Sequence, residues 1–153
     1  MSESTDSQRA VRGLVGFYED LSPDNLEQLS NWYATDAWFK DPFNEVTGID
    51  AIGGIFKHMF ATLHEPRFQV QESVAQGNRA FLIWTFTFRS AVSAPQRCIR
   101  GASHVVLNDD GKVARHRDYW DTGEELYEKT ALIGGLFRFM RRRLAAPQPG
   151  GPA

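Results

Sequence analysis

Between residues 67 and 121 the chain carries four successive runs of strand-type sequence, and this feature constrains the fold most. The runs are 67–76, 79–90, 97–107 and 112–121. The segment 108–111, Asn-Asp-Asp-Gly, is typical of a tight hairpin turn between the last two. Because such short connections join antiparallel neighbours, we predict a four-stranded meander.

Helical patterns surround these strands. Apolar residues recur at helical spacing in 8–20, and a Ser22-Pro23 pair is typical of the start of a second helix. The remaining elements that we expect are a helix to about residue 33, a short strand at 37–41, a helix at 49–63, and helices at 124–130 and 133–144. Helices segregated from an antiparallel sheet indicate an α+β fold.

The chain of 153 residues has the length of one ordinary domain. Aromatic residues make up 12% of it, and disordered chains are poor in such residues, so most of the chain should fold. We predict a disordered start at 1–8, one folded domain at 9–130, an amphipathic helix at 131–144 and a disordered tail rich in Pro and Gly at 145–153.

Charge and cysteine content limit the partners and the compartment. The net charge of −2 argues against a nucleic-acid-binding module. Residues 1–88 carry 6 basic and 12 acidic side chains, whereas 89–153 carry 11 and 7, so the halves can attract each other within a monomer or across a homodimer. Cys98 is the only cysteine, and we recognise neither a signal peptide nor a membrane-spanning run, so we expect a cytoplasmic protein.

Asp41 is the first candidate for chemistry, because it lies between bulky apolar residues in Phe39-Lys40-Asp41-Pro42-Phe43. A carboxylate in an apolar pocket can work as a general base. The alternative, which the sequence favours, is that Asp41 forms an Asx turn before the proline.

The last strand holds the second candidate. Alternate residues of a strand share a face, so His116, Asp118 and Trp120 should point one way, and Arg115, Arg117 and Tyr119 the other. A histidine and an aspartate on one face can share a proton and orient each other. A structural hydrogen bond in a solvated sheet, or an Arg-rich dimer face, explains the pattern equally well.

Tyr18, on the apolar face of the first helix, can donate a hydrogen bond to a developing oxyanion, although most such tyrosines only fill the core. Ser103 and His104 lie on the strand paired with 112–121, and one of them should face the same cavity. We find no Gly-rich phosphate loop after a strand and no histidine pair with metal-ligand spacing, so we expect neither a cofactor nor a metal.

The order of elements, and the run 32–43 with its Asp-Pro-Phe segment, resemble the nuclear transport factor 2 superfamily, which includes ketosteroid isomerases and polyketide cyclases of the SnoaL type. The resemblance covers about residues 9 to 128. It implies a cone-shaped, curved antiparallel sheet wrapped around N-terminal helices, with a C-terminal helix as a cap. The basic helix 131–144 can instead lie on a membrane, but we favour the cap.

The resemblance also implies roles for single residues. In the isomerases, Asp41 would be the base, Tyr18 the oxyanion donor and Trp120 a wall of the pocket, whereas Ser103 replaces a protonated aspartate. In the cyclases, Asp118 would be the acid/base, with His116 or His104 as its partner.

Our hypothesis from the sequence is a cofactor-free acid/base enzyme that acts on a hydrophobic carbonyl compound such as a steroid, terpenoid or polyketide. Asp41 and Asp118 would move protons, His116 would share one, and Tyr18 would stabilise negative charge. The expected pocket residues are Trp120, Phe39, Phe43, Phe56, Phe60, Trp84, Ser103 and His104. The alternatives are a non-catalytic ligand-binding or dimerisation module of the same fold, and an epoxide hydrolase with an Asp–Arg–Asp relay.

Overall fold

The computed structural model describes residues 2–125 of the chain. Its contacts divide the chain into two compact units, Met1–Trp120 and Asp121–Ala153. Of the elements in residues 2–125, the first unit contains every strand and every helix except α4 (Thr122–Glu125), which belongs to the second unit. The predicted domain boundary at residue 130 and the helix and tail predicted for 131–153 lie outside the described residues.

Four helical segments belong to the first unit. They are α1 (Ser2–Glu19), the 3-10 turn η1 (Pro23–Gln28), α2 (Leu29–Trp32) and α3 (Ile49–Thr62). The first helix therefore includes most of the stretch 1–8 that we expected to be disordered. The predicted second helix is a 3-10 turn followed by one α turn. It begins where Pro23 follows Ser22, whose backbone N–H donates to Asn25 Oδ1.

Six strands form one curved, open sheet in the order β2-β1-β6-β5-β4-β3. The strands are β1 (Tyr33–Lys40), β2 (Glu45–Thr47), β3 (His64–Gln76), β4 (Arg79–Arg89), β5 (Arg97–Leu107) and β6 (Val113–Tyr119). The predicted meander of β3 to β6 is confirmed, and so is the α+β class. The sheet is mixed, not wholly antiparallel, because β1 pairs with β6 in parallel and with β2 antiparallel.

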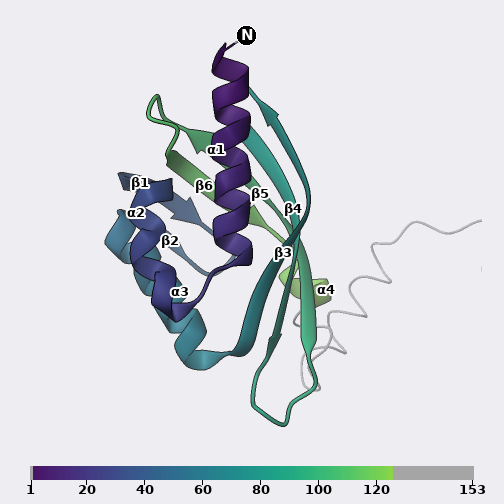
Figure 1. Ribbon diagram of the computed structural model, residues 1–153. Helices are drawn as coiled ribbons and strands as arrows, with labels where there is room; N and C mark the ends of the chain where they lie inside the picture. Colours follow the sequence, from purple (N-terminus) through teal and green to yellow (C-terminus); the bar gives the residue numbers. More distant parts are fainter. Residues whose placement is uncertain (1, 126–153) are drawn as a thin grey trace, which may run out of the picture. The chain divides into compact units, whose positions relative to one another are not determined.

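The helices of the first unit cover one face of this sheet, which we call the inner face. Figure 1 shows α1 crossing that face in front of the long strands. Strand β4 alternates strictly, and its inward side chains, Ala80, Leu82, Trp84, Phe86 and Phe88, are all buried. They share one core with Val11, Leu14 and Phe17 of α1. The alternation that predicted the strands therefore also predicts which side faces the helices.

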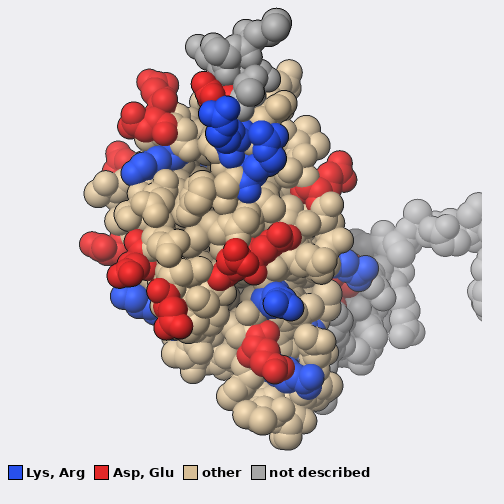
Figure 2. Space-filling model, in the orientation of Figure 1, with Lys and Arg blue, Asp and Glu red and all other residues tan. Residues whose placement is uncertain are grey.

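On the α1 side of the molecule, acidic and basic side chains are interspersed (Figure 2). Within the described part of the chain, no helix has the length and apolar character needed to cross a membrane.

Candidate active site

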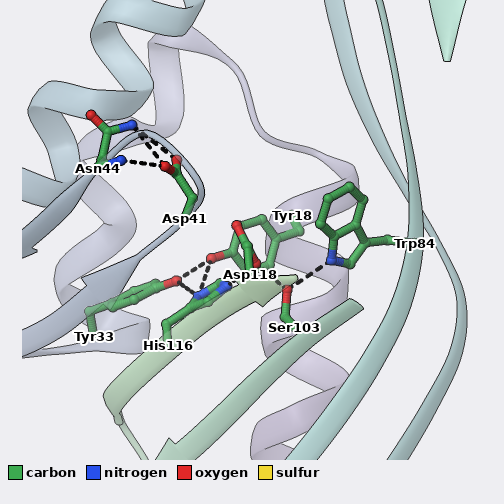
Figure 3. Close-up of polar contacts among 8 residues, drawn as sticks. All are labelled: Tyr18, Tyr33, Asp41, Asn44, Trp84, Ser103, His116 and Asp118. Carbon is green, nitrogen blue, oxygen red and sulfur yellow. Dashed lines mark hydrogen bonds and ion pairs between the residues drawn. The ribbon is translucent and has the colours of Figure 1, made fainter. Parts of the chain in front are cut away.

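Six polar or aromatic side chains meet beneath α1 on the inner face of the sheet (Figure 3). They come from five elements far apart in the sequence, namely Tyr18 of α1, Tyr33 of β1, Trp84 of β4, Ser103 of β5, and His116 and Asp118 of β6. We call this set the polar cluster. It includes the face shared by His116 and Asp118 that strand alternation predicts.

His116 is the centre of the polar cluster, and its side chain is only 2% exposed. Its Nε2 lies 2.7 Å from Asp118 Oδ1. Its Nδ1 lies 2.6 Å from the hydroxyl of Tyr33 and 3.1 Å from that of Tyr18. Because an ionised carboxylate only accepts hydrogen bonds, the neutral imidazole that fits this arrangement carries its proton on Nε2 and accepts at Nδ1.

Asp118 is held through a single oxygen. Oδ1 accepts from His116 Nε2, and also from Ser103 Oγ at 2.5 Å. Ser103 Oγ in turn accepts from the indole N–H of Trp84 at 2.8 Å. Oδ2 makes no hydrogen bond with any residue from 2 to 125, and the Asp118 side chain is 17% exposed. The carboxylate is therefore fixed in orientation while its second oxygen keeps its lone pairs available.

The two tyrosines stay neutral phenols. Burial raises the pKa of Tyr18 well above its usual value, and the neighbouring Tyr33 and the charge of Asp118 raise it further. Burial likewise raises the pKa of Tyr33 far above its usual value. The two hydroxyls are hydrogen-bonded to each other as well as to His116. The polar cluster thus combines one carboxylate with donors that do not ionise at physiological pH.

A small cavity borders the polar cluster. Its volume is about 20 Å³, and it is lined by Tyr18, Phe68, Val70, Leu82, Trp84, Ser103, His116 and Asp118. That space accommodates about one water molecule, whereas pockets for organic ligands measure roughly 300–1,000 Å³. The ligand-sized apolar pocket that we expected is therefore not open at the polar cluster within residues 2–125.

The Trp84 ring lies close against Gly101 of β5. A Cβ atom at Gly101 would lie 2.5 Å from Cη2 of the Trp84 ring. The indole can therefore lie directly against the β5 backbone only because this residue has no side chain. The same placement brings its N–H to Ser103.

The structure does not bring Asp41 into the polar cluster. Its Oδ1 accepts from the backbone N–H groups of Phe43 at 2.7 Å and Asn44 at 2.6 Å, in the loop after β1. The side-chain amide of Asn44 also donates to both carboxylate oxygens. Figure 3 shows the carboxylate turned toward Asn44 and apart from His116. This is the Asx turn that the sequence favoured as the alternative.

His104 also lies elsewhere. Because residues directly opposite in paired strands share a face, His104 lies on the same face as its partner Phe81, which is 52% exposed. The two rings stack with centroids 4.7 Å apart. Ser103 is thus the residue of the pair that reaches the polar cluster.

The predicted pocket aromatics divide into three groups. Of these predicted aromatic residues, Trp84 is the one that lines the cavity. Phe39 and Phe56 are buried and support the polar cluster, with ring centroids 5.0 Å from His116 and 6.1 Å from Tyr18 respectively. Phe43 is 58% exposed and packs against Trp120, and Phe60 is a partly buried residue at the edge of the core; neither lines the cavity.

Tyr33 is the residue that sequence reasoning missed. We placed it at the end of the second helix, but it begins β1, with a register shift in the β1–β6 pairing between Tyr33 and Trp38. Phe68 and Val70 were also missed as cavity residues. Phe68 and Val70 alternate with polar residues along β3, and this alternation predicts that they share one face of the strand. It does not show which end of β3 lies beside α1.

The polar cluster holds groups that suit proton transfer. Among the described residues, no three His, Cys, Asp or Glu side chains gather closely enough to hold a metal ion. The carboxylate, imidazole and phenols can instead accept, share and donate protons.

Comparison with known families gives one match to a sequence model. The model of the SnoaL-like domain matches residues 14–116, a range that contains every residue of the polar cluster except Asp118. No curated protein sequence matches the chain. The family match confirms the resemblance expected from the sequence.

Solved structures show the same fold at low sequence identity. A protein with a ketosteroid isomerase-like fold from Catenulispora acidiphila, in complex with trimethylamine, is 13% identical with a TM-score of 0.66, over 76% of this chain and 88% of the other. A candidate SnoaL-like polyketide cyclase from Shewanella denitrificans is 15% identical with a TM-score of 0.64, over 78% and 96%. A protein of unknown function from Burkholderia pseudomallei is 17% identical with a TM-score of 0.66, over 78% and 93%. These likenesses establish the fold alone.

Proposed function

Because the chain belongs to the SnoaL-like domain family, we propose that it is a cofactor-free acid/base enzyme that moves a proton on a hydrophobic carbonyl compound. A steroid, terpenoid or polyketide is the substrate class that we propose. The observation that carries the proposal is the Asp118 carboxylate, which is held through Oδ1 by two donors while Oδ2 has no partner among residues 2–125.

In the proposed reaction, Asp118 Oδ2 removes a proton from the carbon next to the substrate carbonyl. The C–H bond breaks, an O–H bond forms on Asp118, and the electron pair moves onto the carbonyl oxygen. Return of the same proton to another carbon completes an isomerisation. In a cyclisation, the carbanion attacks a second carbonyl, and the proton on Asp118 then passes to the alkoxide oxygen that this attack creates. Neither outcome consumes a co-reactant.

The neighbours of Asp118 support this step. The N–H of His116 at Nε2 holds the carboxylate in one orientation. Tyr18 lines the cavity, whereas Tyr33 does not, so Tyr18 is the phenol that stabilises the developing negative charge. Its raised pKa keeps its proton in place as a hydrogen-bond donor.

The cavity volume sets a condition on this reaction. A substrate of the proposed class needs far more than about 20 Å³, so the reaction requires the cavity to widen, and Phe68 and Trp84 are the aromatic side chains in its wall besides Tyr18 and His116. The Phe68 and Trp84 rings pack edge to face with centroids 5.9 Å apart, and no covalent bond or ion pair links them.

Exchange of substrate hydrogens with D2O solvent tests the proposal. A panel of cyclic enones and β-diketones incubated with the enzyme should gain deuterium at the carbon next to the carbonyl. Asp118→Asn should lower the exchange rate by about 10²–10⁴-fold, because it removes the base. Asp41→Asn is the matched control and should leave the rate within about twofold, since Asp41 lies in the Asx turn. Exchange that is no faster than with Asp118→Asn across the panel would refute the proposal.

The small cavity and the position of Asp41 favour a second candidate, a non-catalytic module of the same fold. This candidate predicts no exchange with any enone and no effect of Asp118→Asn beyond stability. The epoxide hydrolase alternative lacks such support, because Arg115 and Arg117 are exposed on β6 on the face opposite to Asp118.

A further inference from the structure

Tyr33 is a buried member of the polar cluster, but the proposed reaction gives it no task. It is 1% exposed, and it does not line the cavity. Its ring lies nearly parallel to that of His116, with an angle of 10° between the planes and centroids 6.1 Å apart. Figure 3 shows Tyr33 and Trp84 on opposite sides of His116. The phenol of Tyr33 therefore reaches the imidazole without reaching the cavity.

The protons of the polar cluster can be counted at three atoms that contact one another. These are the hydroxyl oxygens of Tyr18 and Tyr33, and Nδ1 of His116. Each neutral phenol brings one proton, whereas Nδ1 brings none, because the imidazole proton lies on Nε2 toward Asp118. Two protons are therefore shared among three contacts, and Nδ1 needs only one of them.

Distance indicates which hydroxyl donates to Nδ1. The Tyr33 hydroxyl lies 2.6 Å from Nδ1, whereas the Tyr18 hydroxyl lies 3.1 Å from it. The unprotonated nitrogen has one lone pair in the ring plane, so the closer hydroxyl takes it. The proton of Tyr18 then remains for Tyr33 Oη or for a group in the cavity, which Tyr18 lines.

We propose that Tyr33 is a positioning residue that donates to His116 Nδ1 and thereby leaves the proton of Tyr18 for the substrate oxygen. This inference rests on the proposed function, in which Tyr18 stabilises the developing negative charge. The substrate oxygen has only to replace Tyr33 Oη as the acceptor of the Tyr18 proton. The hydrogen bond from Tyr33 to His116 stays in place throughout.

The effect of Tyr33 extends through His116 to Asp118. A donor at Nδ1 keeps the imidazole proton on Nε2, where it holds Asp118 Oδ1. In Tyr33→Phe, the partner that residues 2–125 still offer to Nδ1 is the Tyr18 hydroxyl, so its proton turns away from the cavity. Tyr33→Phe should therefore withdraw the oxyanion donor, although it removes no group that lines the cavity.

The nitrogen signals of His116 test the hydrogen-bond assignment without any substrate. The other three histidines, His58, His64 and His104, are at least partly exposed. Replacing all three with glutamine leaves His116 as the only histidine in the chain. Long-range 1H–15N correlation spectra of this background should show a proton on Nε2 and an unprotonated, hydrogen-bonded Nδ1.

Tyrosine variants in this background identify the donor. Tyr33→Phe should move the Nδ1 signal downfield, toward that of a nitrogen without a hydrogen bond, because the shorter contact is lost. Tyr18→Phe should move it less, because Tyr33 still donates. Tyr119→Phe is the matched control and should leave the signal unchanged, since Tyr119 is 48% exposed and has no contact with His116.

The D2O exchange assay then tests the consequence for the reaction. Tyr18→Phe should lower the exchange rate by about 10²-fold, the usual cost of losing one oxyanion donor. Tyr33→Phe should lose a similar factor, because Tyr18 then donates to His116 instead. The double variant should be no slower than Tyr18→Phe alone, since both changes withdraw the same donor. Circular dichroism verifies that the variants fold.

Two results would overturn the proposal. The first is an Nδ1 signal that moves as far in Tyr18→Phe as in Tyr33→Phe. The second is a double variant whose loss of rate equals the product of the two single losses, as a merely structural Tyr33 would give. A wild-type protein without exchange refutes the proposed function and the role of Tyr18 at the substrate, whereas the nitrogen signals still decide which tyrosine donates to His116.

Discussion

The two faces of one sheet carry aromatic and ionisable residues in very different ways. On the inner face, Tyr18, Tyr33, His116 and Asp118 are joined by hydrogen bonds and are almost completely enclosed. On the outer face, which is the side of the sheet turned away from α1, Phe81 and Tyr119 are exposed, and the Arg117 guanidinium lies over the Tyr119 ring. The same residue types therefore form a hydrogen-bonded cluster on one side and exposed surface on the other, and burial makes the difference.

The largest difference in stability between variants of the two faces should come from replacing their histidines. We expect His116→Ala to lower the free energy of unfolding by about 3–5 kcal/mol, because Asp118 and Tyr33 lose their hydrogen bonds to the buried imidazole and a cavity is left in its place. His104→Ala should cost less than about 1 kcal/mol, since His104 only stacks on exposed Phe81. Urea unfolding of both variants measures this. Equal losses of unfolding free energy in the two variants would contradict the idea that burial makes the histidine of the inner face contribute more to stability.

The next comparison uses neighbouring small residues of β5 that lie on opposite faces. Gly101→Ala should destabilise the fold by about 1–3 kcal/mol, because the new methyl group would meet the Trp84 ring at 2.5 Å. Ala102→Ser, one position along on the outer face, is the control and should change stability by less than about 0.5 kcal/mol. Thermal unfolding with near-ultraviolet circular dichroism also reports whether the indole has moved.

The buried tyrosines predict how stability depends on pH. Because the pKa values of Tyr18 and Tyr33 are raised in the folded state, their contribution is complete below the ordinary tyrosine pKa of about 10 and is lost as the pH rises above it. The free energy of unfolding should therefore fall between about pH 9.5 and 11. Tyr33→Phe should make this fall shallower, and urea unfolding at several pH values measures the slope. A slope equal to that of the wild type would contradict the assignment.

The smallest expected effect lies on the outer face. The guanidinium of Arg115 lies 4.6 Å from the centroid of the Trp38 ring. Arg115→Gln should lower the free energy of unfolding by only about 0.5–1 kcal/mol, because the exposed cation–π contact is lost and no buried group loses a partner. Chemical unfolding measures it. A loss as large as that of His116→Ala would show that the outer face holds the fold together as strongly as the inner one.

Strand alternation predicted much of the sheet and part of the polar cluster. It placed β5 at 97–107, as observed, and it put His116 and Asp118 on one face. It left Ser103 and His104 undecided, because a single bulge reverses which residue points inward. Only the pairing of β5 with β4 and β6 settles that orientation.

Residues whose positions depend on distant pairing were the ones that sequence reasoning missed. Tyr33 belongs to the polar cluster because β1 pairs with β6 in parallel, and no local pattern encodes that partner. Asp41 is governed locally instead. The Asx turn that the sequence favoured is present, because the carboxylate accepts from two backbone N–H groups in the loop, and the base role that the family resemblance implied for Asp41 is not supported by this position.

The parallel pairing of β1 with β6 has a consequence for the order of folding. Tyr33 and His116 are 83 residues apart, and Tyr18 and His116 are 98 apart. Contacts of such long range form late, because the intervening chain must first be closed into a loop. On the ribosome, the polar cluster cannot assemble until β6 has emerged, after nearly the whole first unit has been translated. The fluorescence of Trp84, which is hydrogen-bonded to Ser103 beside Asp118, would therefore report the last step of folding and not the first collapse.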